Sequence, residues 1–80
     1  MPPVLRLGGL RVVIYPNDHE PPHVHLIGPD CHARIRLGTD RRKRSVLSND
    51  GVPARQLGSA LLAIDVERTL LRRAWRQRNG

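Results

Sequence analysis

Hydrophobic and polar residues alternate with the two-residue period of β-strands over the first half of the chain. Residues 4–7 and 10–15 are predicted to be two strands on either side of Gly8-Gly9. This pair readily supplies the positive φ angles of a tight hairpin turn. Residues 10–15 are apolar on much of both faces, which is typical of a strand inside a sheet. The sequence therefore predicts an N-terminal β-hairpin whose second strand is central.

A second hairpin is predicted for residues 23–27 and 32–37, joined by residues 28–31. A loop of two or four residues gives a single register, which pairs His23 with Arg36, His25 with Arg34 and Ile27 with His32. This register sorts the side chains by polarity. The face expected to cover the core holds Val24, Leu26, Ala33, Ile35 and Leu37, and the polar face holds His23, His25, His32, Arg34 and Arg36 together with Ile27.

The segments on either side of this hairpin are predicted to be a surface loop and a short edge strand. Residues 16–22 form a rigid surface loop, because their three prolines lack the N–H that a central strand donates. This loop carries Asp18, His19 and Glu20. The basic run at residues 41–44 leads through a turn into a short strand at residues 45–48, which is expected at an edge because edges are commonly blunted by charge.

From Pro53 onward the apolar period becomes helical, and Pro53 suits a first helical turn. One apolar stripe contains Leu57, Ala60, Leu61 and Ile64, and a second contains Val66, Leu70, Leu71, Ala74 and Trp75. The stripes are rotated by roughly 80–90° from each other, so the segment is either one bent helix or two helices broken near Asp65, and the single helix is preferred. The arginines of the last turns complement the negative end of the helix dipole.

The predicted fold is therefore α+β and consists of one domain, residues 1–80. A small antiparallel sheet of four to five strands packs against a C-terminal helix that is single, bent or split in two. A chain of this size has no room for a second domain or a deep cofactor cavity, so no cofactor is predicted.

The chain is strongly basic, with 14 Lys and Arg against 7 Asp and Glu and a formal net charge of +7. All of these cations except Lys43 are arginine, whose planar fork binds phosphate and carboxylate groups bidentately. Such a surface favours a polyanionic partner such as nucleic acid, but the charge alone leaves equally open the alternative that the arginines reflect codon preference and serve only solubility.

Cysteine content and hydropathy exclude other classes of protein. Cys31 is the only cysteine, which excludes an internal disulfide and a cysteine-rich zinc scaffold. No run approaches the ~20 apolar residues of a membrane span, and no apolar signal-peptide segment begins the sequence. A cytoplasmic location without a membrane partner is therefore expected.

The order of these elements resembles the small bacterial proteins grouped as domain of unknown function 4160, and the resemblance covers nearly the whole chain. It depends most on the segment Asp-His-Glu-Pro-Pro-His-Val-His at residues 18–25 and on the late pair Ala74-Trp75. Members of this family are often encoded beside another small protein and are suspected to belong to toxin–antitoxin pairs. The resemblance therefore implies a cognate small protein and an RNA target.

The histidine cluster and the arginines predict a phosphodiester site. The candidate catalytic residues are Asp18, His19, His23 and His25, and the candidate nucleic-acid-binding residues are Arg34, Arg36, Arg41, Arg42, Lys43 and Arg44. Imidazole titrates near neutral pH, and RNA supplies its own 2′-hydroxyl nucleophile, so two histidines with arginines suffice for a metal-independent ribonuclease. Because Tyr15 and Trp75 are the only aromatic residues, recognition of a duplex or of the backbone is favoured over base stacking.

Other interpretations of these residues stay open. The same three histidines with Asp18 are suitable ligands for a divalent transition metal, but their spacing matches no fixed pattern and nearby arginines oppose a cation, so no metal site is assigned. Alternatively, the rings only brace the loop through backbone hydrogen bonds, and the protein is a non-catalytic module whose edge strand or basic helix docks an acidic cognate protein. A homodimer through the open sheet face is a further alternative.

Overall fold

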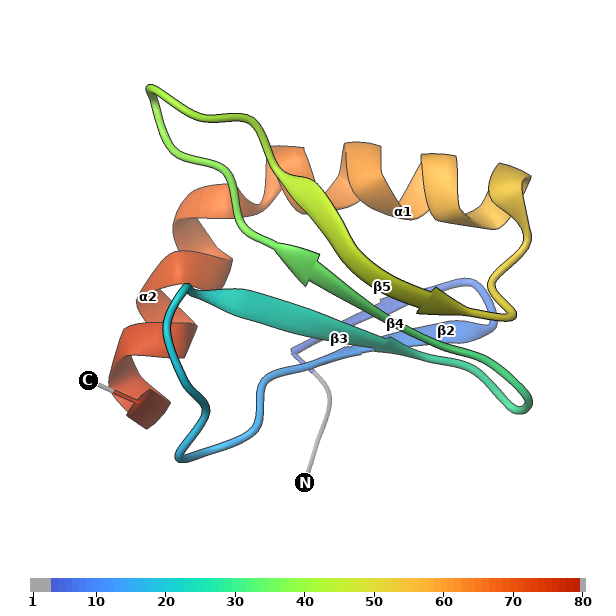
Figure 1. The fold of residues 1–80 in the computed structure, drawn as a ribbon, viewed down its shortest axis with the longest axis horizontal. Coiled ribbons are helices and arrows are strands. Elements are labelled where there is room, and N and C mark those ends of the chain that lie inside the picture. The colour runs from blue at the N-terminus through green and yellow to red at the C-terminus, as the bar shows by residue number, and fades with distance from the viewer. Residues whose placement is uncertain (1–3, 80) are drawn as a thin grey trace.

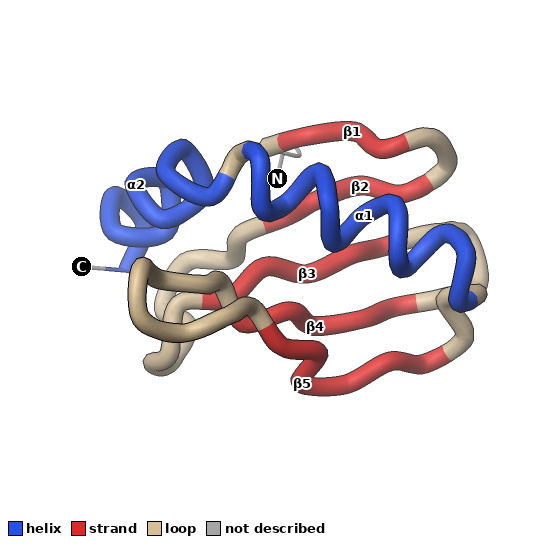
Figure 2. The backbone as a smooth tube through the Cα atoms, turned by 90° about the horizontal axis from the view of Figure 1, so that it is seen from above, coloured by secondary structure: helices blue, strands red, loops and turns tan. Residues whose placement is uncertain are grey.

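The computed structural model describes residues 4–79 and has the predicted α+β fold. It consists of strands β1 (Leu5–Leu7), β2 (Leu10–Val13), β3 (His23–Ile27), β4 (His32–Arg36) and β5 (Ser45–Asp50) and helices α1 (Ala54–Val66) and α2 (Arg68–Asn79). The strands form one sheet in the order β1-β2-β3-β4-β5, with every neighbouring pair antiparallel. Helix α1 lies across one face of this sheet, and α2 lies beside one end of it (Figure 1, Figure 2).

The register predicted for the second hairpin is confirmed. His23 lies opposite Arg36, His25 opposite Arg34 and Ile27 opposite His32. The connection has four residues, and it is closed by the Gly28 N–H, which donates to the Cys31 carbonyl over 2.9 Å. The alternation of polarity sets this register because a shift by one residue would expose one whole apolar face.

The first hairpin is also present, and β2 is an inner strand as expected. Leu7 pairs with Leu10 across a two-residue turn in which Gly8 has a φ of 62°. The second strand ends at Val13, two residues before the predicted end at Tyr15. The Tyr15 carbonyl accepts a hydrogen bond from the Asn79 side chain instead of one from a neighbouring strand.

The core lies between the sheet and the helices. From the sheet it contains Leu10, Val12, Ile14, Val24, Leu26, Ala33, Ile35 and Leu37, and from the C-terminal half Val52, Ala60, Ile64, Leu71, Ala74 and Trp75. These include all five residues assigned to the apolar face of the second hairpin. Burying an Ile or Leu side chain contributes about 1.5–3 kcal/mol, so this layer supplies most of the favourable energy of folding.

The preferred single C-terminal helix is wrong, because the structure has two helices separated by Glu67. Glu67 leaves helical geometry with φ −96° and ψ 17°, although its N–H still donates to the Ala63 carbonyl. After this break α2 runs in a sharply different direction from α1 (Figure 1). The break allows Ile64 of α1 and Leu71 of α2 to reach the same core although their stripes are rotated.

Two residues assigned to the second stripe do not face the core. Val66 at the end of α1 is 81% exposed and Leu70 is 45% exposed. Both predictions assumed a continuous helical stripe, which the break at Glu67 interrupts.

Among the described residues, no helix is long and apolar enough to cross a membrane.

β5 (Ser45–Asp50) is an edge strand, as predicted, but it continues two residues past its predicted end at Ser48. The following turn is closed by Asn49, whose side chain accepts from the Val52 N–H and donates to the Val52 carbonyl. Gly51, with a φ of 88°, supplies a conformation that other residues adopt only with strain.

Antiparallel order puts the loops after β2 and after β4 at the same end of the sheet. Figures 1 and 2 show both loops at the left of the molecule, beside α2. Two contacts between the segments agree with this placement. The Leu37 N–H donates to the Pro22 carbonyl over 3.0 Å, and Arg68 of α2 donates to the Thr39 carbonyl over 3.3 Å. The charged and histidine-rich segments therefore meet at one end.

Candidate functional site

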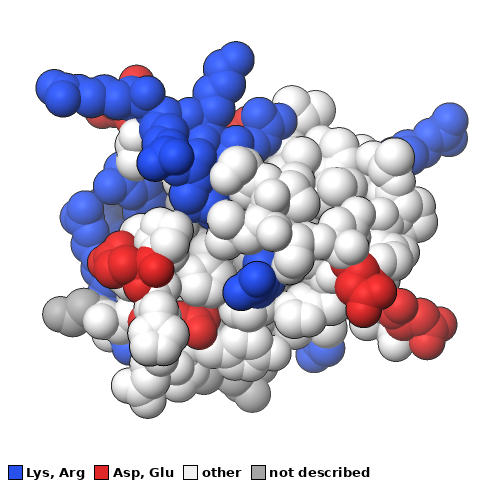
Figure 3. All heavy atoms as spheres, in the orientation of Figure 1, with Lys and Arg blue, Asp and Glu red and all other residues white. Residues whose placement is uncertain are grey.

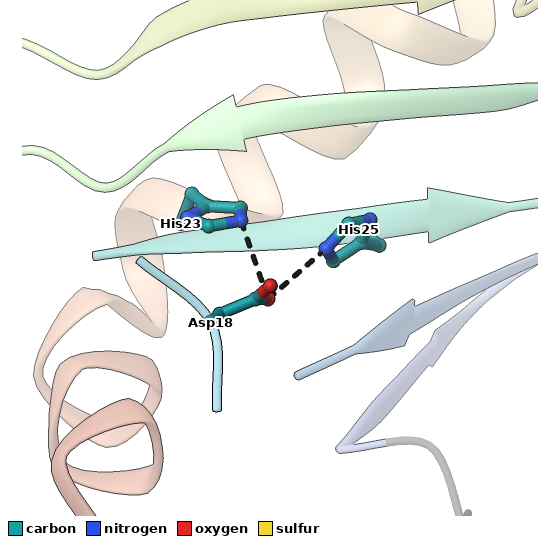
Figure 4. A group of neighbouring side chains, drawn as sticks. All are labelled: Asp18, His23 and His25. Atoms are coloured by element: carbon teal, nitrogen blue, oxygen red, sulfur yellow. Dashed lines mark hydrogen bonds and ion pairs between the residues drawn. The ribbon is translucent and has the colours of Figure 1, made fainter. Parts of the chain in front are cut away.

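The loop between β2 and β3 is held against the sheet by the last residue of α2. The Asp18 backbone N–H donates to Asn79 Oδ1 over 2.6 Å, and Asn79 Nδ2 donates to the Tyr15 carbonyl over 3.1 Å. These bonds fix the loop at both sides of the Pro16-Asn17 dipeptide. The side chain of Asp18 is then directed toward the histidines of β3 (Figure 4).

Asp18, His23 and His25 form one compact cluster, named here the Asp-His cluster. The Asp18 Oδ2 atom lies 3.3 Å from Nε2 of His23 and 3.3 Å from Nε2 of His25. The contact with His25 has hydrogen-bond geometry, whereas the contact with His23 is at ion-pair distance. The two rings are 5.2 Å apart between centroids and tilted by 58°. Because the histidines alternate with Val24, both point to the face of β3 that the helices do not cover.

The second nitrogen of each ring also has a partner. His23 Nδ1 lies 2.8 Å from the Pro21 carbonyl oxygen. A carbonyl can only accept, so this nitrogen carries the proton and a neutral His23 keeps its lone pair on Nε2, the atom near Asp18. His25 Nδ1 shares a hydrogen bond of 2.9 Å with His32 Nε2. Each ring is thus oriented from the side opposite the carboxylate.

The cluster is largely shielded from solvent, and only its carboxylate is accessible. The side chains of His23 and His25 are 8% and 9% exposed, whereas that of Asp18 is 26% exposed. Tyr15 packs edge-on against His25, with ring centroids 4.6 Å apart. Burial lowers the pKa of His25, and the charges of His23 and His32 act in the same direction, although Asp18 opposes them by hydrogen bonding and by its charge. The neutral form of His25 is therefore favoured.

The structure brings together three of the four candidate catalytic residues and one residue that the sequence did not select. His19 is exposed and lies outside the cluster. His32 was not among the candidate catalytic residues, yet it supports His25 through its ring. The predicted register contained a signal for this contact, because it placed both rings on the polar face with His32 diagonal to His25 across the two strands.

The arginines opposite the histidines lean away from them. Arg34 Nε donates to Ser48 Oγ and Arg36 Nε donates to Ser45 Oγ, both over 3.0 Å. Both serines are on β5, on the far side of β4 from the histidines. Arg36 Nη2 also donates to the Lys43 carbonyl over 2.7 Å, so this side chain braces the loop that contains the basic run.

Most of the positive charge gathers at the end of the molecule that contains α2 and the β4–β5 loop (Figure 3). A hollow of about 290 Å³ is lined by four arginines of α2, together with Asp40 and Thr69. A second hollow of about 210 Å³ lies between the loop and the helices, and Arg68 lines both. The cationic side chains of these two hollows form the basic surface, which consists of Arg42, Lys43, Arg44, Arg68, Arg72, Arg73 and Arg76.

Two arginines of the basic surface form ion pairs with carboxylates, and others do not. Arg68 Nη2 lies 3.1 Å from Asp40 Oδ1, and Arg44 Nε lies 3.6 Å from Asp65 Oδ2. Within residues 4–79, Arg72, Arg73 and Arg76 form no ion pair. The sequence had explained these three arginines by the helix dipole. Their spacing along one face of a helix was a signal for a binding surface.

The fold and the site define a small α+β domain with a largely buried Asp-His cluster on the sheet face that α1 does not cover and a basic surface at the same end. The chain belongs to the family described as domain of unknown function, DUF4160, whose model matches residues 9–76. Searches of the curated proteins and of the solved structures gave no match.

Proposed function

We propose that this protein binds RNA through the basic surface, by contacts with the phosphate backbone of a duplex or folded RNA. The observation that carries the proposal is the hollow lined by four arginines of α2, three of which have no carboxylate partner within the described residues. Arginine binds phosphate oxygens bidentately, and each contact releases counterions from the nucleic acid. The site is thus suited to a dense row of phosphates.

The spacing of the arginines supports binding to a polymer. Arg68, Arg72 and Arg76 follow one another at intervals of four residues, so they lie along one face of α2 and rise by about 6 Å at each step. The loop cations extend this surface beyond the helix through the hollow that Arg68 shares. A chain of phosphates could contact several of these groups together, whereas a single small anion would contact one or two.

The positions of the aromatic residues favour backbone contacts over stacking on single-stranded bases. Trp75 is 3% exposed and belongs to the core, and Tyr15 packs against His25. Proteins that bind single strands use exposed aromatic rings as platforms for bases. Within residues 4–79 the basic surface contains no such ring, so we expect duplex RNA to bind more tightly than an unpaired strand of equal length.

Salt dependence tests the proposal. The affinity for a labelled RNA duplex should fall linearly with the logarithm of the salt concentration. The Arg72→Gln/Arg73→Gln double variant should bind more weakly and reduce the slope by about two, one for each lost phosphate contact. Fluorescence anisotropy at four or more salt concentrations measures both quantities.

A matched control removes the same charge elsewhere. Arg6 and Arg11 are paired on β1 and β2, on the sheet face opposite the core. The Arg6→Gln/Arg11→Gln variant should retain the slope and most of the affinity. An equal loss in both double variants would show that net charge alone attracts RNA, which would refute binding by the basic surface. A duplex DNA of the same length and an acidic polypeptide distinguish an RNA ligand from other polyanions.

Cleavage of the bound RNA is a separate step of this proposal, assigned to His23 and His25 as proton-transfer groups. Cleavage should continue in EDTA, yield a 2′,3′-cyclic phosphate end and be abolished by His23→Asn/His25→Asn. Cleavage lost in EDTA and restored by Zn²⁺ would assign the residues to a metal-dependent reaction. The suspected toxin role predicts that expression arrests growth and that the same double variant relieves the arrest.

A further inference from the structure

Three atoms of the types that bind transition metals converge on one point beneath β3. The carboxylate of Asp18 and one ring nitrogen each of His23 and His25 all lie within 4.8 Å of one another (Figure 4). Two of the three separations, from Asp18 Oδ2 to the Nε2 atoms, are 3.3 Å. Ligands held about 2.0–2.1 Å from zinc at tetrahedral angles are separated by about 3.3 Å. Two edges of the cluster therefore match the edge of a tetrahedral metal site, and the third, between the two rings, is no longer than 4.8 Å.

The rings are also oriented as metal ligands are. In metal sites the nitrogen that does not bind the ion usually donates to a carbonyl or another fixed group, which sets the tautomer. His23 Nδ1 has such a partner in the Pro21 carbonyl, and His25 Nδ1 has one in His32. Both contacts direct Nε2 of the ring toward Asp18.

We propose that Asp18, His23 and His25 bind a divalent transition-metal ion of the zinc type, with His32 as a positioning residue for His25. Two imidazoles and one carboxylate leave at least one coordination position for water or an anionic ligand. The donor set is too rich in nitrogen for Mg²⁺ or Ca²⁺, which prefer oxygen ligands. This inference is independent of RNA binding by the basic surface. It is an alternative to metal-free proton transfer by His23 and His25, because a bound ion would occupy the Nε2 atoms of both rings.

Electrostatics and access agree with a bound cation. The arginines that oppose the histidines in the register are directed to β5, so their charges do not face the cluster. Asp18 is the most exposed of the three side chains, so an ion can enter from its side.

Conservative variants test the site, and only Asp18→Asn among them is isosteric. In His23→Asn the new amide nitrogen can take the place of Nδ1 and donate to Pro21, while the Nε2 ligand is lost. Asp18→Asn retains the shape of the side chain and removes the charge. His19→Asn is the matched control, because His19 is exposed and outside the cluster.

Isothermal titration of the EDTA-treated and desalted protein with ZnCl₂ should show one Zn²⁺ per chain. His23→Asn and Asp18→Asn should each weaken binding by more than about 100-fold, and His19→Asn should leave it unchanged. His32→Ala should weaken it by about 10- to 100-fold without abolishing it, as expected for a group that only orients a ligand. Absence of binding by the unchanged protein, or an equal effect of His19→Asn, would overturn the proposal.

A measurement on the unchanged chain avoids any dependence on variants that fold poorly. Long-range ¹H–¹⁵N spectra resolve the two nitrogens of each histidine ring. Addition of Zn²⁺ should shift Nε2 of His23 and His25 and leave the ring of His19 unaffected. A shift confined to His19, or no shift at all, would show that the Asp-His cluster is not a metal site.

Discussion

Asn79 is the residue that joins the C-terminal helix to the candidate site. Its side-chain amide contacts the Asp18 N–H and the carbonyls of Tyr15 and Trp75. The first of these bonds connects residues that are 61 positions apart in the sequence. The position of the Asp18 carboxylate against the two rings therefore depends on where α2 ends.

Loss of this side chain should loosen the loop. Asn79→Ala leaves two backbone groups of the loop without a partner, so we expect the free energy of unfolding to fall by about 1 kcal/mol. The amide of Asp18 should also exchange with solvent faster. Urea denaturation and amide hydrogen exchange measure the two effects. Gln77→Ala, at an exposed position near the end of the same helix, is the control, and unchanged protection of the Asp18 amide would contradict the assignment.

The sequence predicted which residues lie together in the candidate site better than it predicted how they are held. His23 and His25 were placed on one face because alternate residues of a strand share a face, and Asp18 was placed in the adjoining loop. Two supporting residues, His32 and Asn79, were missed. His32 is diagonal to His25 in the predicted register, whereas the contact between Asn79 and Asp18 joins residues 61 positions apart, which no local pattern specifies.

At the scale of the elements, the sheet was more predictable than the helices. The register of β3 and β4 follows from alternation, since one face must be apolar throughout. The C-terminal segment presented two rotated stripes that were compatible with one bent helix or with two. Tertiary packing decides between them, because the break at Glu67 is what allows Ile64 and Leu71 to share the core.

Adjacent leucines of α2 provide a test of this packing. Leu71 is fully buried and Leu70 is 45% exposed, although the sequence assigned both to one apolar stripe. Leu71→Ala should lower the free energy of unfolding by about 2–5 kcal/mol, because it leaves a cavity in the core. Leu70→Ala should cost less than about 1 kcal/mol. Urea denaturation measures the free energy of unfolding of both variants. Equal losses would contradict the structure and indicate one continuous apolar stripe that buries both leucines.

At the scale of the whole molecule, the topology places the Asp-His cluster and the basic surface at the same end. The loops after β2 and β4 share that end because the strands follow one another in antiparallel order. The α2 helix then lies beside both loops and contributes arginines to one and Asn79 to the other. The Asp-His cluster and the basic surface are thus separate features with a common support, and changes in α2 can affect both.

RNA binding by the basic surface is the central claim, and the most direct test is to map the contact on the unchanged protein. In ¹H–¹⁵N spectra recorded during titration with an RNA duplex, the account predicts that the largest shifts occur at residues 39–44 and along α2 from Arg68 to Arg76. The amides of β1 and of the turn at Gly8-Gly9 should change little. Shifts concentrated on β1 and β2, or no shifts at an RNA concentration that saturates binding, would contradict it.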